Sequence, residues 1–125
     1  MKTIVVEPNR SFYIARSAIV GAGRGLFART ALAAGSRLEV EGTLIRANSL
    51  SDRSTRYADA YKFRIGEFLL IPMGFGGMLN HSATPNMEKN IRGTRLYMRA
   101  LHGIEKGAEL LFTYSKYAQK RFGLE

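Results

Sequence analysis

At 125 residues, the chain has the length of one domain, and its hydrophobic residues, 46% of the total, can form a core without disulfide or metal staples. The chain contains no cysteine, which excludes disulfides, thiolate zinc sites and a cysteine nucleophile. Nineteen Lys and Arg against ten Asp and Glu give a net charge of +9, which attracts nucleic acid or an acidic protein. We therefore expect a single domain over residues 1–125.

The segment MKTIVVEPNR has only three consecutive apolar residues, too few for the core of a signal peptide. No run approaches the roughly 20 apolar residues of a membrane-spanning helix. The sequence therefore predicts an intracellular protein, cytoplasmic or associated with a nucleoid or chromatin, with no membrane partner. The basic residues are scattered and no aromatic series interleaves with them, which favours a solvated basic surface over a dedicated nucleic-acid site, so any association with nucleic acid would be indirect.

Short apolar runs separated by glycine-bearing turns predict a mainly β fold built largely of antiparallel strands. Segment 48–61 has cap residues and weak helical spacing, and we expect it to be the one short helical or irregular insert. The runs on either side of Gly66 are predicted to pair as a hairpin. The predicted strands are 3–7, 12–19, 26–32, 37–45, 62–65, 68–73, 87–91, 95–101 and 109–114.

The glycine-rich loop Gly21-Ala22-Gly23-Arg24-Gly25 is a weak match to a dinucleotide-binding fingerprint. That fingerprint needs a helix that opens at the last glycine, whereas LFARTAL follows here with the composition of a strand. Three glycines between strands could let a ligand contact bare backbone. On this loop alone, a hairpin turn without a ligand is the better interpretation.

Asn80 and His81 lie in the stretch GGMLNHSATPN, where a hydrogen-bonded structural role is the simplest interpretation. The other histidine, His102, is in a different turn and no carboxylate cluster adjoins either one, so we expect no metal site. In ELLFTYSKY, Tyr114 and Tyr117 could be core residues with surface hydroxyls or functional residues, and for Tyr117 the two interpretations weigh equally.

The order of these motifs is more informative than any one of them. A glycine-rich loop, then NHS-x-x-PN, then E-L-x-F-x-Y near the C-terminus resembles the SET-domain family of protein lysine methyltransferases, over about residues 11–117. Gly74-Phe75-Gly76 before the NHS motif is most similar to the minimal, viral-type SET proteins. Many relatives have a cysteine where Ala83 stands, and we expect neither a pre-SET segment nor a zinc-binding post-SET segment.

The resemblance implies several small curved antiparallel sheets with a C-terminal pseudoknot and one short helical insert. It implies S-adenosylmethionine as cofactor, contacted by the residues Gly23, Arg24, Gly25, Asn80, His81 and Tyr117. Tyr114 would be the catalytic tyrosine. Tyr61 is the candidate for a second pocket tyrosine, with Tyr57 as the fallback, and Tyr57, Phe75 and Phe112 would line the substrate channel. Tyr117 would cover the adenine or close that channel.

Such an enzyme must present a neutral lysine amine, although a free lysine has a pKa of about 10.4. A narrow apolar channel beside a cationic sulfonium lowers that pKa, and holding the reacting atoms in line supplies most of the rate. The +9 charge would repel a histone-like tail unless Glu39, Glu41, Glu67, Glu88 and Glu109 formed an acidic groove. An acidic protein, or a lysine-bearing protein already bound to nucleic acid, suits the charge equally well.

Two alternatives come from other functional classes. One is a SET-fold module that binds cofactor or peptide without turnover, and the other is a basic β domain that binds nucleic acid. Tyr114 argues against the first, since a module without catalysis would not need its hydroxyl. The short segment after Tyr114 leaves open whether a second subunit, in a homodimer, completes the channel.

Overall fold

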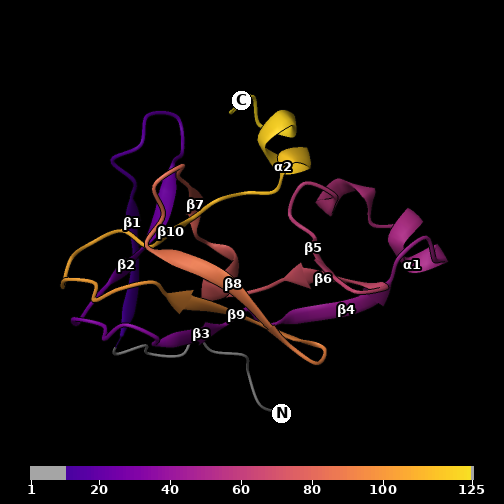
Figure 1. Cartoon of the computed structure of the whole chain (residues 1–125). Coiled ribbons are helices and arrows are strands. Elements are labelled where there is room, and N and C mark those ends of the chain that lie inside the picture. Colours follow the sequence, from indigo (N-terminus) through magenta and orange to yellow (C-terminus); the bar gives the residue numbers. More distant parts are fainter. Residues whose placement is uncertain (1–10, 125) are drawn as a thin grey trace, which may run out of the picture.

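The computed structural model describes residues 11–124, so the strand expected at 3–7 lies outside the described residues. Small sheets surround a shared core, with the C-terminal helix on one side of the molecule and a short helical insert at one end (Figure 1). The strands are β1 (Phe12–Arg16), β2 (Arg24–Ala28), β3 (Arg37–Glu39), β4 (Gly42–Arg46), β5 (Phe63–Ile65), β6 (Phe68–Pro72), β7 (Asn80–His81), β8 (Met87–Arg92), β9 (Arg95–Ala100) and β10 (Leu111–Phe112). The helices are α1 (Leu50–Arg53), the 3₁₀ turns η1 (Arg56–Ala58) and η2 (Phe75–Gly77), and α2 (Lys116–Arg121).

The mainly β architecture with small antiparallel sheets is confirmed. Strands β1 and β2 form a hairpin in which Ala15 pairs with Gly25 and Arg16 with Arg24. The strand expected at 12–19 ends earlier because the Ser17 N–H donates to the Gly23 carbonyl and the chain turns there. Arg24 and Gly25, expected in the loop, are strand residues instead.

The single strand expected at 37–45 is two strands in different sheets. β3 joins β9 and β8, whereas β4 joins β6 and β5. Gly42 allows β4 to lie close to β6, because a Cβ at this position would lie 2.0 Å from the Ile71 carbonyl oxygen. The hairpin predicted around Gly66 forms, and the strands predicted on either side of Gly93 pair as a second hairpin.

The insert predicted at 48–61 is confirmed as short helical turns, with Ser49 as the N-cap of α1. A single helical element was expected, but the chain forms a second helix, α2, after the last strand. Its N-cap Ser115 accepts a hydrogen bond from the Ala118 N–H, and Ala118 is buried. One capping serine and one small buried residue thus begin a helix that the sequence pattern did not predict.

The strand predicted at 109–114 is shorter, and its pairing is parallel rather than antiparallel. β10 runs beside β7, with Leu111 opposite Asn80 and Phe112 opposite His81. The Asn86 side chain holds the two segments together, since its Oδ1 accepts from the Leu111 N–H at 2.9 Å and its Nδ2 donates to the Glu109 carbonyl at 2.9 Å. The NHS-x-x-PN segment is therefore bonded directly to the C-terminal motif.

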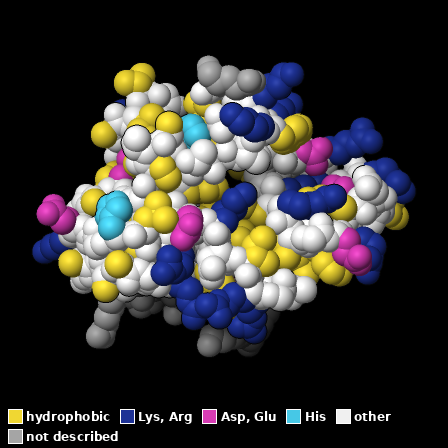
Figure 2. All heavy atoms as spheres, viewed as in Figure 1, with side chains coloured by type: hydrophobic (Ala, Val, Ile, Leu, Met, Phe, Trp, Pro, Cys, Tyr) yellow, Lys and Arg dark blue, Asp and Glu magenta, His cyan; other side chains and the backbone are white. Residues whose placement is uncertain are grey.

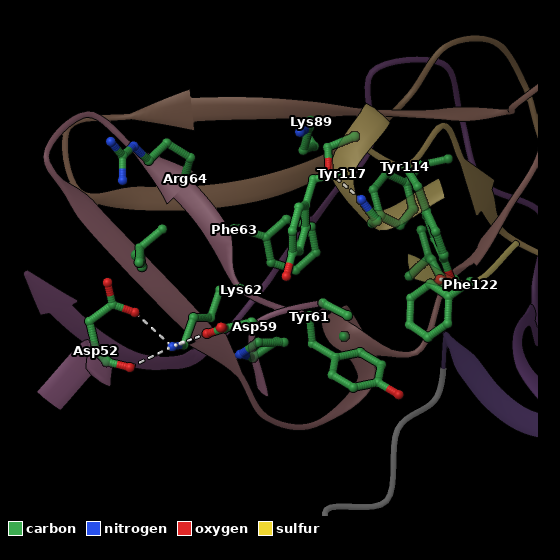
Figure 3. A pocket seen from close by; sticks show the side chains of 18 residues that line it. Asp52, Asp59, Tyr61, Lys62, Phe63, Arg64, Lys89, Tyr114, Tyr117 and Phe122 are labelled. Atoms are coloured by element: carbon green, nitrogen blue, oxygen red, sulfur yellow. Dashed lines mark hydrogen bonds and ion pairs between the residues drawn. The ribbon is translucent and has the colours of Figure 1, made fainter. Parts of the chain in front are cut away.

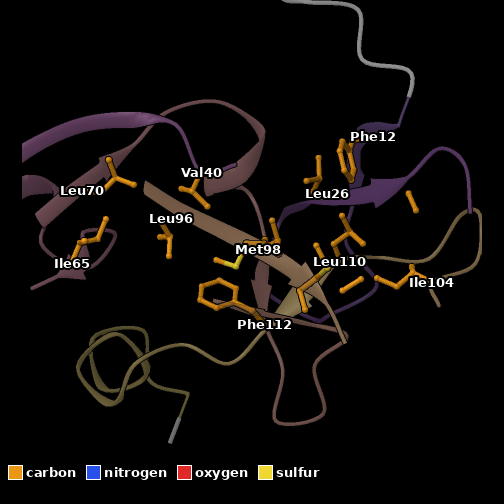
Figure 4. Packing of buried hydrophobic residues seen from close by; sticks show 14 residues of the cluster. Phe12, Leu26, Val40, Ile65, Leu70, Leu96, Met98, Ile104, Leu110 and Phe112 are labelled. Atoms are coloured by element: carbon orange, nitrogen blue, oxygen red, sulfur yellow. The ribbon is translucent and has the colours of Figure 1, made fainter. Parts of the chain in front are cut away.

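Buried side chains from most of the strands form one core (Figure 4). Leu26, Leu96, Met98 and Leu110 are fully buried at its centre. Phe112 extends this core toward α2, and Tyr114 packs against its edge. Among residues 11–124, no helix has the length and apolar composition needed to cross a bilayer.

Candidate functional site

The carboxylate of Glu109 connects three segments that are far apart in the sequence. Its Oε1 accepts a hydrogen bond from the Ser17 hydroxyl at 2.8 Å, and its Oε2 accepts from Asn80 Nδ2 at 2.9 Å. Asn80 Nδ2 also donates to the Arg24 carbonyl at 3.1 Å. Because both partners of this amide nitrogen are acceptors, the orientation of the Asn80 amide is fixed. The glycine loop, the NHS motif and the C-terminal motif therefore meet at one polar cluster.

Gly25 lies directly against this cluster. A Cβ at Gly25 would lie 2.3 Å from Glu109 Oε2 and 2.8 Å from Asn80 Nδ2. Gly23 differs, because its φ is +73° and a Cβ there would meet no atom within 4 Å. Close packing therefore requires glycine at position 25, whereas backbone conformation favours glycine at position 23 and leaves open space around it.

Tyr114 is held from two directions. Its backbone N–H donates to His81 Nδ1 at 2.9 Å, and its hydroxyl donates to the Leu79 carbonyl at 3.1 Å. Burial raises the pKa of the Tyr114 phenol above its ordinary value, and the nearby Tyr61 and Glu109 raise it further. The phenol therefore stays neutral near physiological pH, and it cannot act as a phenolate base.

A cavity of about 550 Å³ opens beside Tyr114 (Figure 3). Aromatic rings form much of its wall: Phe112 lies 5.0 Å from Tyr114 and 5.8 Å from Phe63, between ring centroids. Phe122 lies 5.9 Å from Tyr114 and 5.4 Å from Tyr61. Leu79 and Leu69 also line the cavity. Such a cavity suits an apolar side-chain stem better than a free, hydrated ion.

The C-terminal segment forms one wall of this pocket. Tyr117, Ala118 and Phe122 all line it. Gln119 Nε2 donates to the Tyr114 carbonyl at 2.8 Å, which ties α2 to the tyrosine. The segment after Tyr114 therefore supplies one wall of the pocket.

The structure brings together only some of the predicted site residues. Tyr61, Phe112, Tyr114 and Tyr117 line the pocket. Gly23, Arg24, Gly25, Asn80 and His81 lie outside its lining, in or beside the Glu109 cluster, and the two regions meet at Leu79 and Tyr114.

Two residues that were predicted to line the substrate channel lie outside this pocket. Tyr57 is 80% exposed on η1 and does not line the pocket, because the short helical turn directs its side chain to solvent. Phe75 packs against the core from η2, and is also absent from the lining.

Charged side chains occupy one end of the pocket. The Lys62 ammonium, with its side chain only 3% exposed, donates to Asp52 Oδ1 at 2.8 Å and to Asp59 Oδ1 at 2.7 Å. Burial alone would lower the pKa of Lys62, but the bonds to the two carboxylates raise it above its ordinary value. The hydrogen bonds from Lys62 and from the Asn48 N–H lower the pKa of Asp52. Lys62 thus stays charged and fastens the insert to β5.

Sequence reasoning missed several of these residues. Glu109 was noted in the E-L-x-F-x-Y motif, but its position beside Gly25 and Asn80 depends on the parallel β7–β10 pairing. Phe122 carried a weaker signal, an aromatic residue after the basic run Lys120-Arg121. Lys62 had none that distinguishes it from a surface lysine. Within residues 11–124, no group of three or more His, Asp or Glu side chains is arranged to hold a metal ion.

The fold and site define a β protein in which a polar cluster and an aromatic pocket share one tyrosine. The sequence pattern of the SET domain matches residues 23–115. The chain therefore belongs to the SET domain family. A comparison with curated protein sequences finds no match.

Solved structures share this fold. A candidate histone methyltransferase of Plasmodium falciparum is similar, with 22% identity and a TM-score of 0.70 over 87% of this chain and 96% of that one. An active polycomb repressive complex 2 gives 24% identity and a TM-score of 0.72 over 86% of this chain. The S-adenosylmethionine-bound complex termed ctPRC2 has 21% sequence identity and a TM-score of 0.73 over 93% of this chain. This chain spans only 15% and 17% of those two polycomb chains, and at such identities the likeness shows the fold alone.

Proposed function

We propose that this protein is an S-adenosylmethionine-dependent protein lysine N-methyltransferase. The single observation that supports it best is the position of Tyr114. One side of Tyr114 is bonded to the NHS segment through His81 and Leu79, and the other side lines the aromatic pocket. A methyl donor held at the polar cluster and a lysine stem in the pocket would therefore meet at this residue.

The polar cluster has a donor and acceptor set that fits the methionine end of the cofactor. Both protons of the Asn80 amide are used, but its Oδ1 has no partner among the described residues and can accept from an ammonium group. The Arg24 side chain is exposed and can pair with a carboxylate. The open space around Gly23 lets a ligand reach the backbone. Asn80, Arg24 and Gly23 would hold that end, and Tyr117 is proposed to cover the adenine or close the lysine channel.

When bound, the cofactor would supply an electrophilic methyl carbon on its sulfonium: a neutral lysine amine would form a carbon–nitrogen bond to this carbon as the carbon–sulfur bond breaks, and the neutral thioether would leave. The pocket helps the amine lose its proton to water, because an apolar wall disfavours the ammonium form. Phe112, Phe122 and Tyr61 would hold the lysine stem. The Tyr114 hydroxyl donates a hydrogen bond to the Leu79 carbonyl, so the lone pairs of the hydroxyl oxygen remain available for weak contacts to the polarised methyl group.

Two finer expectations belong to the same proposal. The likeness to minimal, viral-type SET proteins would make a second copy of the chain a contributor to the channel. Size-exclusion chromatography with light scattering tests this directly, and a monomer that is fully active would overturn it. An intracellular location near nucleic acid would give such an enzyme its substrates.

The proposal is tested by incubating the protein with methyl-labelled S-adenosylmethionine and a cell extract, followed by mass spectrometry of the labelled proteins. Methylated lysine that depends on the Tyr114 hydroxyl would support it. Cofactor binding without methyl transfer would favour the binding-module alternative. Salt-dependent affinity for nucleic acid with no cofactor binding would favour the third one.

A further inference from the structure

Two unpaired cations line the pocket. Arg64 on β5 and Lys89 on β8 both contribute to its wall. Neither side chain forms an ion pair or a hydrogen bond with any residue in the described part of the chain. Both residues are exposed, so a bound peptide could reach them.

The two acidic residues of the pocket are both ion-paired with a lysine of the same pocket. The Asp52 and Asp59 carboxylates both bind the Lys62 ammonium (Figure 3). Arg64 lies near enough to lower the pKa of Asp52 slightly further, but it forms no bond with that residue. In the view of Figure 3, Arg64 and Lys89 lie above this ion-paired group, with Arg64 on the same side of the view as Asp52. One ammonium between two carboxylates leaves this group with one net negative charge, and Arg64 and Lys89 bring the charged side chains of the lining to a net charge of +1.

The acidic groove that a basic substrate would need is not at this pocket. None of the five glutamates considered from the sequence, Glu39, Glu41, Glu67, Glu88 and Glu109, lines it. Glu67 pairs with Arg46 and Glu88 with Arg99, while Glu109 holds Ser17 and Asn80. Figure 2 shows Lys and Arg side chains around the hollow in this face of the molecule.

We propose that Arg64 and Lys89 select target lysines that have acidic neighbours in the substrate sequence. This inference rests on the proposed function and narrows its substrate class. When a lysine enters the pocket, the residues on either side of it must lie over the rim, where Arg64 and Lys89 meet them. Anionic neighbours gain attraction there, and basic neighbours are repelled. Each exposed pair is expected to change the specificity by about two- to five-fold.

The test uses two synthetic peptides that differ only in the residues flanking one central lysine, acidic in one and arginine in the other. The wild-type protein should methylate the acidic peptide with a kcat/KM roughly ten-fold higher, since two pairs act together. Salt should reduce this preference, because the pairs are exposed. Arg64→Glu combined with Lys89→Glu should reverse it. Arg92→Glu combined with Lys106→Glu, both in exposed turns or strand ends outside the pocket lining, makes the same change in net charge and should keep the wild-type preference.

A second readout separates this inference from the function itself. Binding of the same peptides, with norleucine in place of lysine, is followed by fluorescence anisotropy and needs no turnover. Preference for the acidic peptide that the double variant loses supports the role of the rim. Equal binding, or preference for the arginine peptide, overturns it even where methyl transfer is observed. Failure of methyl transfer with a charge-dependent binding preference would instead count against the proposed function alone.

Discussion

The backbone N–H of Tyr114 donates to Nδ1 of His81 over 2.9 Å, and the two rings lie 5.2 Å apart. A nitrogen that accepts this bond carries no proton, so the neutral imidazole has its proton on Nε2. The parallel pairing of β7 with β10 sets this contact, since it brings His81 opposite Phe112. A residue of the NHS motif thereby positions the tyrosine that we propose to be catalytic.

Tyr114→Phe should remove most of the methyl transfer and leave cofactor affinity nearly unchanged. The change deletes only the hydroxyl, which bonds to the Leu79 carbonyl and faces the proposed reaction centre. We expect kcat to fall by roughly 10²-fold, the scale of a small misplacement in an in-line reaction. The loss of stability should be only about 1 kcal/mol, the net worth of one hydrogen bond. Single-turnover rates and thermal unfolding measure the two effects, and unchanged turnover would refute the assignment.

Asn80→Ala and Glu109→Ala should be coupled in their effect on stability. The Asn80 amide and the Glu109 carboxylate are hydrogen-bonded at 2.9 Å, so removing either one leaves the other without that partner. A double-mutant cycle in urea should give a coupling free energy of about 0.5–3 kcal/mol. Asn80→Ala should also weaken cofactor binding. Strict additivity of the two changes, or wild-type affinity in Asn80→Ala, would contradict the shared role of this residue.

Gly25→Ala should destabilise the fold by about 1–3 kcal/mol, the range for overpacking. The new methyl group would lie 2.3 Å from Glu109 Oε2, so the carboxylate would have to move away from Ser17 and Asn80. The cost of Gly25→Ala should be smaller in a Glu109→Ala background, where the nearest atom, Glu109 Oε2, is gone and only Asn80 Nδ2 at 2.8 Å remains. Equal costs in both backgrounds, measured by chemical denaturation, would show that another contact is responsible.

The Lys62 ion pairs should make the stability of the protein depend on pH at both extremes. The pKa of Asp52 is lowered from 3.8, so its contribution is present above that value and is lost as the pH falls through the folded-state pKa. The pKa of Lys62 is raised from 10.5, so its contribution is complete below that value and is lost as the pH rises through the folded-state pKa.

Asp52→Asn should therefore lower the melting temperature at neutral pH, and the difference from wild type should shrink below pH 3.8. Glu67→Gln is the matched control, because the Arg46–Glu67 pair is exposed and should contribute little at any pH. A difference between Asp52→Asn and wild type that does not change with pH would mean that packing, and not charge, accounts for the loss.

Local patterns predicted the hairpin around Gly66 and the strands on either side of Gly93, because each turn and its strands are close in the sequence. The order of the motifs predicted that Asn80, His81 and Tyr114 belong to one site, and in the structure these residues lie on adjoining segments. The sequence could not show that residues 37–45 divide between two sheets. The need for glycine at position 42 comes from its close contact with Ile71, which is far away in the sequence. The sequence could not show that Tyr57 and Phe75 lie outside the pocket, because composition does not determine which way the side chains of a short helical turn point.

The measurement that tests the central claim most directly is isothermal titration of the purified protein with S-adenosylmethionine, alongside Asn80→Ala and Tyr114→Phe. The account predicts saturable one-to-one binding to the wild type, similar binding to Tyr114→Phe and weakened binding to Asn80→Ala. Absence of saturable binding to the folded wild-type protein, or full affinity in Asn80→Ala, would contradict it.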